Sequence, residues 1–271
     1  MIVSRHNRTL KDIRRLNRSK GELAQLEGTH LVASALAQGL VLETVLATPD
    51  YLESAAGREL AAALPAPPLL VEPGLLAQLS DADAPRGVLA VARLPRRGAE
   101  ALPVAAGGAY LYVEGLQDPG NLGALARVAE AAGCRGMALA PGSAHPNHPR
   151  ALRASAGSLL RLPLAVGAAP EELSRHLAAA EPRWVALVPR GGEDLYRAVF
   201  GGSGGTLVLA VGAEGPGISP TLLDRSDLRL TIPMAPPVES LNVTVAAALV
   251  LFELRRRSRR EPLGVGPPSE V

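Results

Sequence analysis

Apolar residues in the first part of the chain switch between helical and strand spacing. In residues 9–18, Leu10, Ile13 and Leu16 recur three apart with basic residues between them, which predicts a short amphipathic helix with a basic outer face. Similar patterns predict helices at 31–38, 57–64 and 74–79 and strands at 41–47, 69–71 and 88–93. This alternation over residues 1–95 predicts one small α/β domain.

A second alternation of the same kind fills the rest of the chain. Short apolar runs predict strands at 110–113, 137–140, 184–188, 207–212 and 228–233, and helices at 122–132, 150–160, 171–180 and 241–257. Because these strands are almost continuously apolar, both faces of their sheet are expected to be covered, which is typical of a parallel sheet. We therefore predict a second α/β domain at 109–258, after a Pro-, Gly- and Ala-rich linker at 96–108 and before a flexible tail at 259–271.

The loops beyond the carboxyl ends of parallel strands are where such sheets bind ligands. Polar loops follow Val113, Gly212 and Pro233. The last of them leads through Ser240 into an apolar helix, and we expect Ser240 to be its N-cap. That helix is apolar on nearly every side until Glu253, which predicts that it is buried.

Composition narrows the class of protein. The chain has 271 residues, 47% of them hydrophobic, enough for one or two domains with a sizeable core. Its single cysteine, Cys134, excludes an internal disulfide. No apolar run approaches the 18 or so residues of a membrane span, and no apolar segment follows the basic N-terminus. A cytoplasmic protein without membrane contact is expected.

Charge is distributed unevenly although the net charge is only +2. Cations crowd the first twenty residues against a single acid, Asp12, and a second basic cluster occupies 255–260. Basic ends on a near-neutral body fit contact with nucleic acid, while two solvated faces are the alternative. The predicted RNA contacts at the N-terminus are Arg5, Arg8, Lys11, Arg14, Arg15 and Arg18.

Three segments carry candidate chemistry. In the first, Asp118-Pro-Gly makes a turn, Asn121 is placed to cap the following helix, and Arg127 lies six residues further on. In the second, residues 207–218 run from a strand into a Gly-rich loop with one acid, Glu214. Its G-x-x-G-x-G spacing is not the dinucleotide fingerprint, and no P-loop occurs. The third is Ser240-Leu-Asn242 before the last helix.

Other candidate sites lack the neighbouring residues that their chemistry would require. His145 and His148 have no acid or cysteine near them in sequence, so no metal site is predicted. The stretch Arg153-Ala-Ser-Ala-Gly157 is not a nucleophile elbow. Tyr110, Tyr112 and Trp184 are expected in the core rather than as platforms for bases.

The three segments together resemble the SpoU (TrmH-like) family of RNA 2′-O-ribose methyltransferases, within the SPOUT superfamily. The resemblance spans residues 109–257 and is specific because three motifs keep their order and spacing. The matching stretches are Asn121-Leu-Gly-Ala with Arg127, Val211-Gly-Ala-Glu-Gly215 with Gly217, Ile232-Pro-Met234, and Glu239-Ser-Leu-Asn-Val243 with Ala246. Arg153-Ala-Ser-Ala-Gly157 also looks like a family segment. Residues 1–95 look like the family's L30e-like substrate-binding domain, where Glu27-Gly28 echoes a common stretch.

The resemblance implies a fold, a cofactor and a set of roles. The fold is an α/β SPOUT domain with a parallel sheet and a deep trefoil knot; the cofactor is S-adenosylmethionine (AdoMet), and a homodimer completes the site. Implied catalytic residues are Arg127, Asn121, Ser240 and Asn242. Implied cofactor contacts are Val211, Gly212, Glu214, Gly215, Ile232, Met234, Ser240 and Leu241, although Glu214 pinning its own loop is an equal alternative. Arg153 joins the implied RNA contacts.

Methyl transfer to a ribose 2′-hydroxyl asks for positioning and for a group that receives or stabilises the hydroxyl proton. Because arginine stays charged, we expect Arg127 to hold phosphate and hydroxyl and to stabilise developing alkoxide charge. A separate N-terminal domain favours rRNA over tRNA as the substrate. The alternatives are a non-catalytic RNA-binding or ribosome-assembly factor with this fold, and an antibiotic-resistance 23S rRNA 2′-O-methylase.

Overall fold

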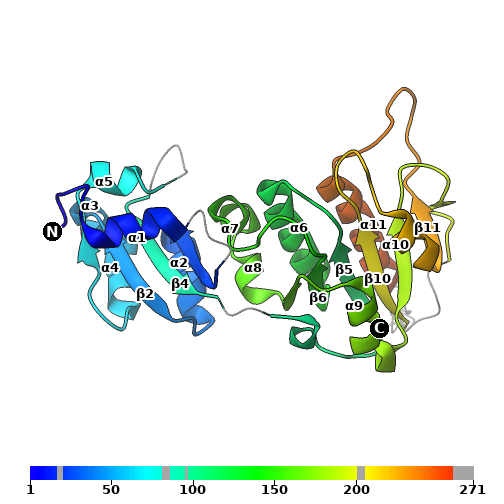
Figure 1. Cartoon of the computed structure of the whole chain (residues 1–271), viewed down its shortest axis with the longest axis horizontal. Helices are drawn as coiled ribbons and strands as arrows, with labels where there is room; N and C mark the ends of the chain where they lie inside the picture. The colour runs from blue at the N-terminus through cyan, green and yellow to red at the C-terminus, as the bar shows by residue number, and fades with distance from the viewer. Residues whose placement is uncertain (17–20, 81–85, 95–96, 200–204, 259–271) are drawn as a thin grey trace, which may run out of the picture.

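The computed structural model describes residues 1–16, 21–80, 86–94, 97–199 and 205–258. Two sheets lie at opposite ends of an elongated molecule, with the N-terminal domain at one end and the C-terminal domain at the other (Figure 1). The predictions for Arg18 and for the tail at 259–271 lie outside the described residues.

The N-terminal domain is built on a four-stranded mixed sheet of order β1-β4-β2-β3. β4 pairs antiparallel with β1 and β2, and β2 pairs parallel with β3. The strands are β1 (Leu23–Glu27), β2 (Leu42–Ala47), β3 (Leu69–Leu70) and β4 (Val88–Arg93), and the helices are α1 (Arg8–Leu16), α2 (Thr29–Ala37), α3 (Pro49–Glu53), α4 (Ala55–Ala63) and α5 (Pro73–Ala77). The sequence analysis missed β1, whose apolar run is interrupted by Gln25, a side chain that is nevertheless buried.

Helix α1 forms as its spacing predicts. Leu10 and Ile13 are buried in a cluster with Leu46 and Val71, while Arg8 and Arg15 stay exposed on the outer face. The predicted amphipathic helix with a basic face is therefore confirmed.

The C-terminal domain has a seven-stranded sheet of order β7-β6-β5-β10-β8-β11-β9, and every pair is parallel. This confirms the predicted parallel sheet. The strands are β5 (Gly108–Val113), β6 (Gly136–Leu139), β7 (Leu164–Val166), β8 (Arg183–Leu187), β9 (Glu193–Asp194), β10 (Thr206–Val211) and β11 (Leu228–Thr231). The unpredicted strands, β7 and β9, are short and form the two edges. The trefoil knot stays a prediction, because strand order and register do not by themselves define a knot.

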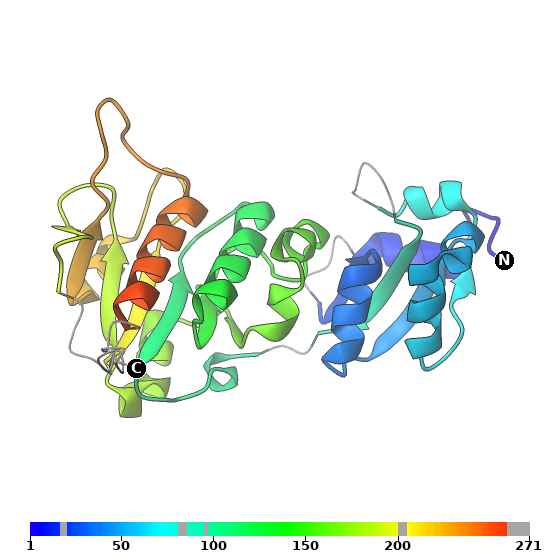
Figure 2. The same cartoon turned by 180° about the vertical axis from the view of Figure 1, so that it is seen from behind.

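Helices cover both faces of this sheet (Figures 1 and 2). Along β5, Leu111 and Val113 point into the core under α6 and α11, whereas Tyr110 and Tyr112 point into the core under α9 and α10. Tyr112 packs edge-to-face on Trp184 with ring centroids 5.2 Å apart, which confirms the aromatic core prediction. The helices are α6 (Pro119–Ala132), α7 (Pro149–Ser155), α8 (Ser158–Arg161), α9 (Pro170–His176), α10 (Pro220–Arg225) and α11 (Val243–Ser258), with short 3-10 turns at Ala99–Ala101 and Ala178–Ala180.

The segment that joins the domains is packed rather than free where it is described. Leu102 is 2% exposed in the core beside Tyr110, and its carbonyl contacts a ring nitrogen of His176 at 2.8 Å. The backbone N–H of Val166 donates to the carbonyl of Arg97 at 2.8 Å. The Pro- and Ala-rich composition therefore indicates an absence of regular structure here, not an absence of packing.

Candidate functional site

A pocket of about 430 Å³ opens at the carboxyl ends of β8, β10 and β11. Its walls are the loops after these strands and the segment that enters α11. All eight residues that the resemblance assigns to the cofactor line it: Val211, Gly212, Glu214, Gly215, Ile232, Met234, Ser240 and Leu241. Segments far apart in sequence thus meet in one concave site, at the edge of the sheet where parallel α/β proteins bind ligands.

The glycine-rich loop after β10 folds back on itself. A Cβ on Gly212 would lie 2.1 Å from the carbonyl carbon of Gly217, and the N–H of Gly217 donates to the carbonyl of Ala213 at 3.0 Å. Further along, Ser219 donates from its N–H and its hydroxyl to the carboxylate of Glu114, at 2.7 and 2.8 Å. Gly212 is therefore required for the closure of the loop itself.

A chain of side-chain hydrogen bonds joins the three sequence motifs. The amide nitrogen of Asn242 donates to Oδ1 of Asn121 at 3.2 Å, and Nδ2 of Asn121 donates to the carboxylate of Glu214. The hydroxyl of Thr244 also reaches the carbonyl of Asn121 at 3.5 Å. The carboxylate of Glu214 thus pins its loop to α6, the role that the sequence left open beside cofactor contact, and it also lines the pocket.

Helix α6 begins at Pro119, and its N-cap is Asp118, not Asn121 as predicted. Oδ1 of Asp118 accepts from the N–H of Asn121 at 2.8 Å, and Oδ2 pairs with Arg150 of α7 at 3.2 Å. Pro119 occupies the first helical position, where a missing N–H costs no hydrogen bond. The N-cap is therefore Asp118, three residues before Asn121. The side chain of Asn121 is therefore available for its hydrogen bonds to Glu214 and Asn242.

The start of α11 also differs from its prediction. The helix begins at Val243, and Oδ1 of Asn242 accepts from the N–H of Thr244 at 2.9 Å, so Asn242 rather than Ser240 caps it. Ser240 lies in the preceding segment, which has no regular secondary structure, and lines the pocket. Asn is as good a cap as Ser. The three residues before the helix, Ser240 to Asn242, all line the pocket.

Arg127 is not gathered into this cluster. It lies six residues along α6 from Asn121, roughly 9 Å up the helix axis, and it is exposed and outside the pocket lining. Within the described chain its guanidinium makes neither a hydrogen bond nor an ion pair. The structure therefore brings Asn121, Ser240 and Asn242 together and leaves Arg127 available to a bound substrate.

One wall of the pocket was not predicted. Leu187, Val188 and Pro189, at the end of β8, line it opposite the α11 segment. Beyond them, Arg190 pairs with Glu239 at 3.1 Å across the rim, and both side chains are more than two-thirds exposed. The sequence contained the information needed to predict this wall, because the predicted strand at 184–188 ends at the same edge of the sheet.

Comparison with known proteins decides the family. Residues 108–252, more than half of the chain, match the model of the SpoU rRNA methylase family. The chain belongs to the SpoU rRNA methylase family. Residues 7–90 match the MRM3-like substrate-binding domain, in agreement with the substrate-binding domain expected at the N-terminus of this SpoU methylase.

Relatives and solved structures span nearly the whole SpoU chain. An uncharacterized tRNA/rRNA methyltransferase of Synechocystis is 35% identical over 263 residues, covering 94% of this chain and 93% of the relative. The 23S rRNA (guanosine(2553)-2′-O)-methyltransferase RlmP of Bacillus subtilis is 28% identical, covering 94% and 98%. The SpoU methyltransferase AviRb of Streptomyces viridochromogenes, solved in complex with AdoMet, has a TM-score of 0.86 at 26% identity, covering 94% and 99%.

The cations predicted to bind RNA differ in the hydrogen bonds and ion pairs that they already make within the protein. Arg8 and Arg15 share Asp12 at 3.8 and 3.9 Å, but both are more than four-fifths exposed, so these surface pairs leave them accessible. Arg14 donates to Gln78 at 3.0 Å, the Nε of Arg5 contacts a ring nitrogen of His6 at 3.4 Å, and Lys11 is exposed. Arg153 instead pairs with the nearly buried Glu27 across the domain seam at 3.2 Å. The RNA roles of these residues stay predictions.

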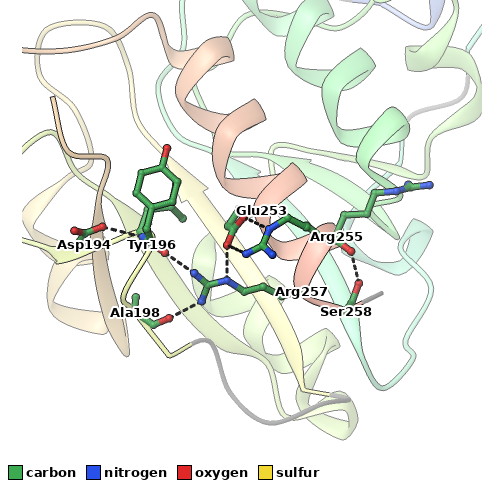
Figure 3. Close-up of polar contacts among 9 residues, drawn as sticks. Asp194, Tyr196, Ala198, Glu253, Arg255, Arg257 and Ser258 are labelled. Atoms are coloured by element: carbon green, nitrogen blue, oxygen red, sulfur yellow. Dashed lines mark hydrogen bonds and ion pairs between the residues drawn. The ribbon is translucent and has the colours of Figure 1, made fainter. Parts of the chain in front are cut away.

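The arginines at the C-terminal end of α11 donate hydrogen bonds to other groups of the protein (Figure 3). Arg257 donates to Glu253 and to the carbonyls of Leu195 and Ala198 at 2.6–2.9 Å, tying the loop after β9 to the helix. Arg255 donates to the carbonyl of Ala131 at 3.0 Å. These cations fasten α11 to its neighbours.

Glu253 provides a test of that anchor. Hydrogen bonds from Arg256 and then Arg257 lower the pKa of Glu253 from 4.5 to about 2. Since the folded pKa lies below the unfolded one, the stabilisation is present above pH 4.5 and is lost as the pH falls toward 2. Glu253→Gln should therefore lower the free energy of unfolding by about 1 kcal/mol at pH 7 and by less at pH 3. Urea denaturation at both pH values measures this, with the exposed Glu59→Gln as control; an equal loss at both would contradict it.

Three further observations limit the chemistry that the described residues can perform. In the described ranges, no group of three or more His, Cys, Asp or Glu residues is placed to hold a metal ion, and His145 and His148 instead accept from nearby backbone N–H groups. None of the helices described is both long and apolar enough to cross a membrane. Burial raises the pKa of the Cys134 thiol to about 12, which leaves it unreactive.

Proposed function

We propose that this chain methylates a ribose 2′-hydroxyl of a structured rRNA and takes the methyl group from AdoMet. The observation that carries the proposal is the hydrogen-bonded union of Asn121, Glu214 and Asn242 at the pocket on the strand ends. A non-catalytic RNA-binding factor has no need for three motif loops fastened around an open pocket.

The pocket suits AdoMet in size and chemistry. Its volume of about 430 Å³ falls within the usual range for small-molecule sites, about 300–1,000 Å³. Apolar side chains of Leu187, Ile232 and Leu241 offer faces for an adenine ring, and the loop backbone at Gly212–Gly215 offers hydrogen bonds. When bound, the cofactor supplies an electrophilic methyl group on a sulfonium. The negative charge of Glu214 at the pocket favours that cation.

The side chains around the pocket position the acceptor. Asn121 and Asn242 are held by each other and by Glu214, so their orientation is set before substrate binds. Arg127, with no partner in the described protein, binds the phosphate next to the reacting ribose and stabilises negative charge that develops on the 2′-oxygen. Ser240 lies at the pocket wall and orients the ribose.

The relatives support rRNA as the substrate. RlmP of Bacillus subtilis, aligned over 94% of this chain, is by its name a 23S rRNA guanosine 2′-O-methyltransferase. The N-terminal match to a substrate-binding domain and the exposed cations of α1 fit a large folded RNA.

The direct test has two parts. Calorimetry in the presence of a chelator should show AdoMet binding, because no metal takes part in the proposed site. Purified enzyme should then methylate rRNA from a strain that lacks it, at one ribose located by mapping. AdoMet binding without any methyl transfer would favour the non-catalytic alternative, and no binding at all would refute the assignment of the pocket.

We also propose that two copies associate through α11. This helix was predicted to be buried, yet an apolar stripe along it is exposed: Val245 (49%), Leu249 (40%) and Phe252 (47%), with Leu241 (36%) just before the helix. Spacings of four and three residues put Val245, Leu249 and Phe252 on one helix face. A two-fold axis would bury the same stripe of both copies, and the stripe ends next to the pocket entrance at Asn242.

Leu249→Glu should break this dimer. A two-fold interface receives the new charge twice and loses two buried leucines, so the dissociation constant should rise at least about 100-fold. Light scattering should give the dimer for the wild type and 28.0 kDa for the variant. The exposed Val41→Glu, on the N-terminal domain, should leave the mass unchanged. A wild-type monomer at micromolar concentration would refute the interface.

A further inference from the structure

A second pocket, of about 370 Å³, lies at the seam between the two domains. The N-terminal domain contributes the end of β1, the first turn of α2 and the start of β4, and the C-terminal domain contributes α7. Its polar lining is mostly cationic or hydrogen-bond donating, from His30, Arg86 and Arg153, with one carboxylate, Glu27. This pocket shares no residue with the pocket on the strand ends.

Arg86 is an exposed cation without an acceptor. A Cβ on Gly28 would lie 3.4 Å from the Cδ of Arg86, so the arginine stem crosses the start of α2. In the part of the chain that the structure describes, neither the guanidinium of Arg86 nor the ring of His30 has a hydrogen bond or an ion pair. Gly28 has no side chain with which to cap α2, which adds unpaired N–H groups next to these two residues.

The single carboxylate does not cancel this charge, because it is already matched. Oε2 of Glu27 accepts from Arg153 at 3.2 Å and from Ser80 at 2.7 Å, and Oε1 accepts from Gln25 at 2.8 Å. The side chain of Glu27 is only 8% exposed, whereas that of Arg153 is 27% exposed. Glu27 therefore holds Arg153 in place across the seam with part of its guanidinium at the surface.

We infer that the seam pocket binds a phosphodiester group of the substrate RNA through Arg86 and His30, with Arg153 on the opposite wall. Planar guanidinium groups match phosphate geometry, and an unpaired arginine at a pocket gains most from an anion. The site also adjoins the basic face of α1, because Arg14 donates to Gln78, two residues before Ser80 of the pocket wall. One RNA strand then contacts both domains and fixes their arrangement over the catalytic pocket. That the anion belongs to RNA rests on the proposed function.

The test measures RNA affinity of the full chain against salt. Arg86→Ala with His30→Ala should weaken binding of an rRNA fragment about tenfold near 0.1 M salt and should flatten the log–log salt dependence by about one unit, for one lost phosphate contact. Arg86→Lys should keep the slope. Arg58→Ala is the matched control, since Arg58 is an exposed arginine of α4 outside the pocket. Among the residues that the structure describes, its guanidinium donates only to the carbonyl of Glu53. AdoMet binding should be unchanged in all variants.

Inorganic phosphate separates the two sources of the anion. Competition by phosphate for the wild type but not for the double variant would support a phosphodiester site used by RNA. Phosphate binding at the pocket with unaltered RNA affinity in the double variant would overturn the RNA assignment, and an unchanged affinity and slope without phosphate binding would overturn the site itself. Loss of AdoMet binding or of methyl transfer in the wild type would instead count against the proposed function, because the seam measurement needs neither.

Discussion

Arg127→Ala should slow single-turnover methyl transfer by at least about two orders of magnitude, the scale expected for removing one positioned catalytic group. Within the described chain Arg127 forms no hydrogen bond or ion pair, and it does not line the cofactor pocket. Its replacement should therefore leave the free energy of unfolding and the AdoMet affinity nearly unchanged. A large loss of rate without a loss of stability would identify a residue that acts on the substrate alone.

Two variants sharpen this measurement. Arg127→Lys should restore little activity, because a compact ammonium cannot present two parallel donors to a phosphate. Arg175→Ala removes an exposed arginine of α9, on the opposite face of the sheet, and should have no effect on the rate. Near-normal turnover of Arg127→Ala at saturating RNA would make Arg127 an ordinary surface residue of α6.

Gly212→Ala should weaken AdoMet binding by about ten- to a hundredfold. The added Cβ would lie 2.1 Å from the carbonyl carbon and 2.2 Å from the oxygen of Gly217, and 2.4 Å from the nitrogen of Ile218. Backbone atoms cannot rotate away as a side chain can, so the loop has to open. Overpacking of this kind costs about 1–3 kcal/mol, and each 1.4 kcal/mol is a tenfold change in affinity.

Calorimetry with AdoMet measures this effect, and denaturation shows whether the fold survives. Gly74→Ala is a suitable control, because a Cβ there meets nothing within 4 Å and its backbone has no positive φ. The Gly212 variant should remain folded with a wild-type RNA affinity, since the N-terminal domain is distant from the loop (Figure 1). Wild-type AdoMet affinity would show that the closed loop is not needed for the cofactor.

Local sequence pattern was sufficient for the motif segments and for most of the elements, but not for the strands β1, β7 and β9. The run of apolar residues in each strand specifies a two-sided buried sheet, because parallel strands face helices on both sides, as Leu111 and Tyr112 do in opposite cores. Chain order then places the loops after Val211 and Ile232 at one edge, since parallel strands share the direction of their carboxyl ends. Spacing of the motifs pointed to the family before any contact was visible.

Contacts between distant residues were decided only by the tertiary structure. No local pattern shows that Glu214 accepts from Asn121 on another element, or that Glu27 pairs with Arg153 across the seam. Gln25 interrupts the apolar pattern of β1, which is why the strand was missed. Its side chain can nevertheless be buried because it donates hydrogen bonds to the carbonyl of Leu79 in a remote loop and to Glu27 of its own strand.

The last helix shows the limit most directly. Its composition is apolar on nearly every side, and apolar composition specifies that a surface avoids water, not which surface covers it. The chain itself covers Ala247, Val250 and Leu251, but leaves Val245, Leu249 and Phe252 exposed. The sequence by itself therefore determined that this helix is apolar on nearly every side, whereas only the packing of α11 beside α6 decided which stripe stays exposed. The physical reason is that burial is a property of the assembled neighbours, whereas hydrophobicity belongs to each residue alone.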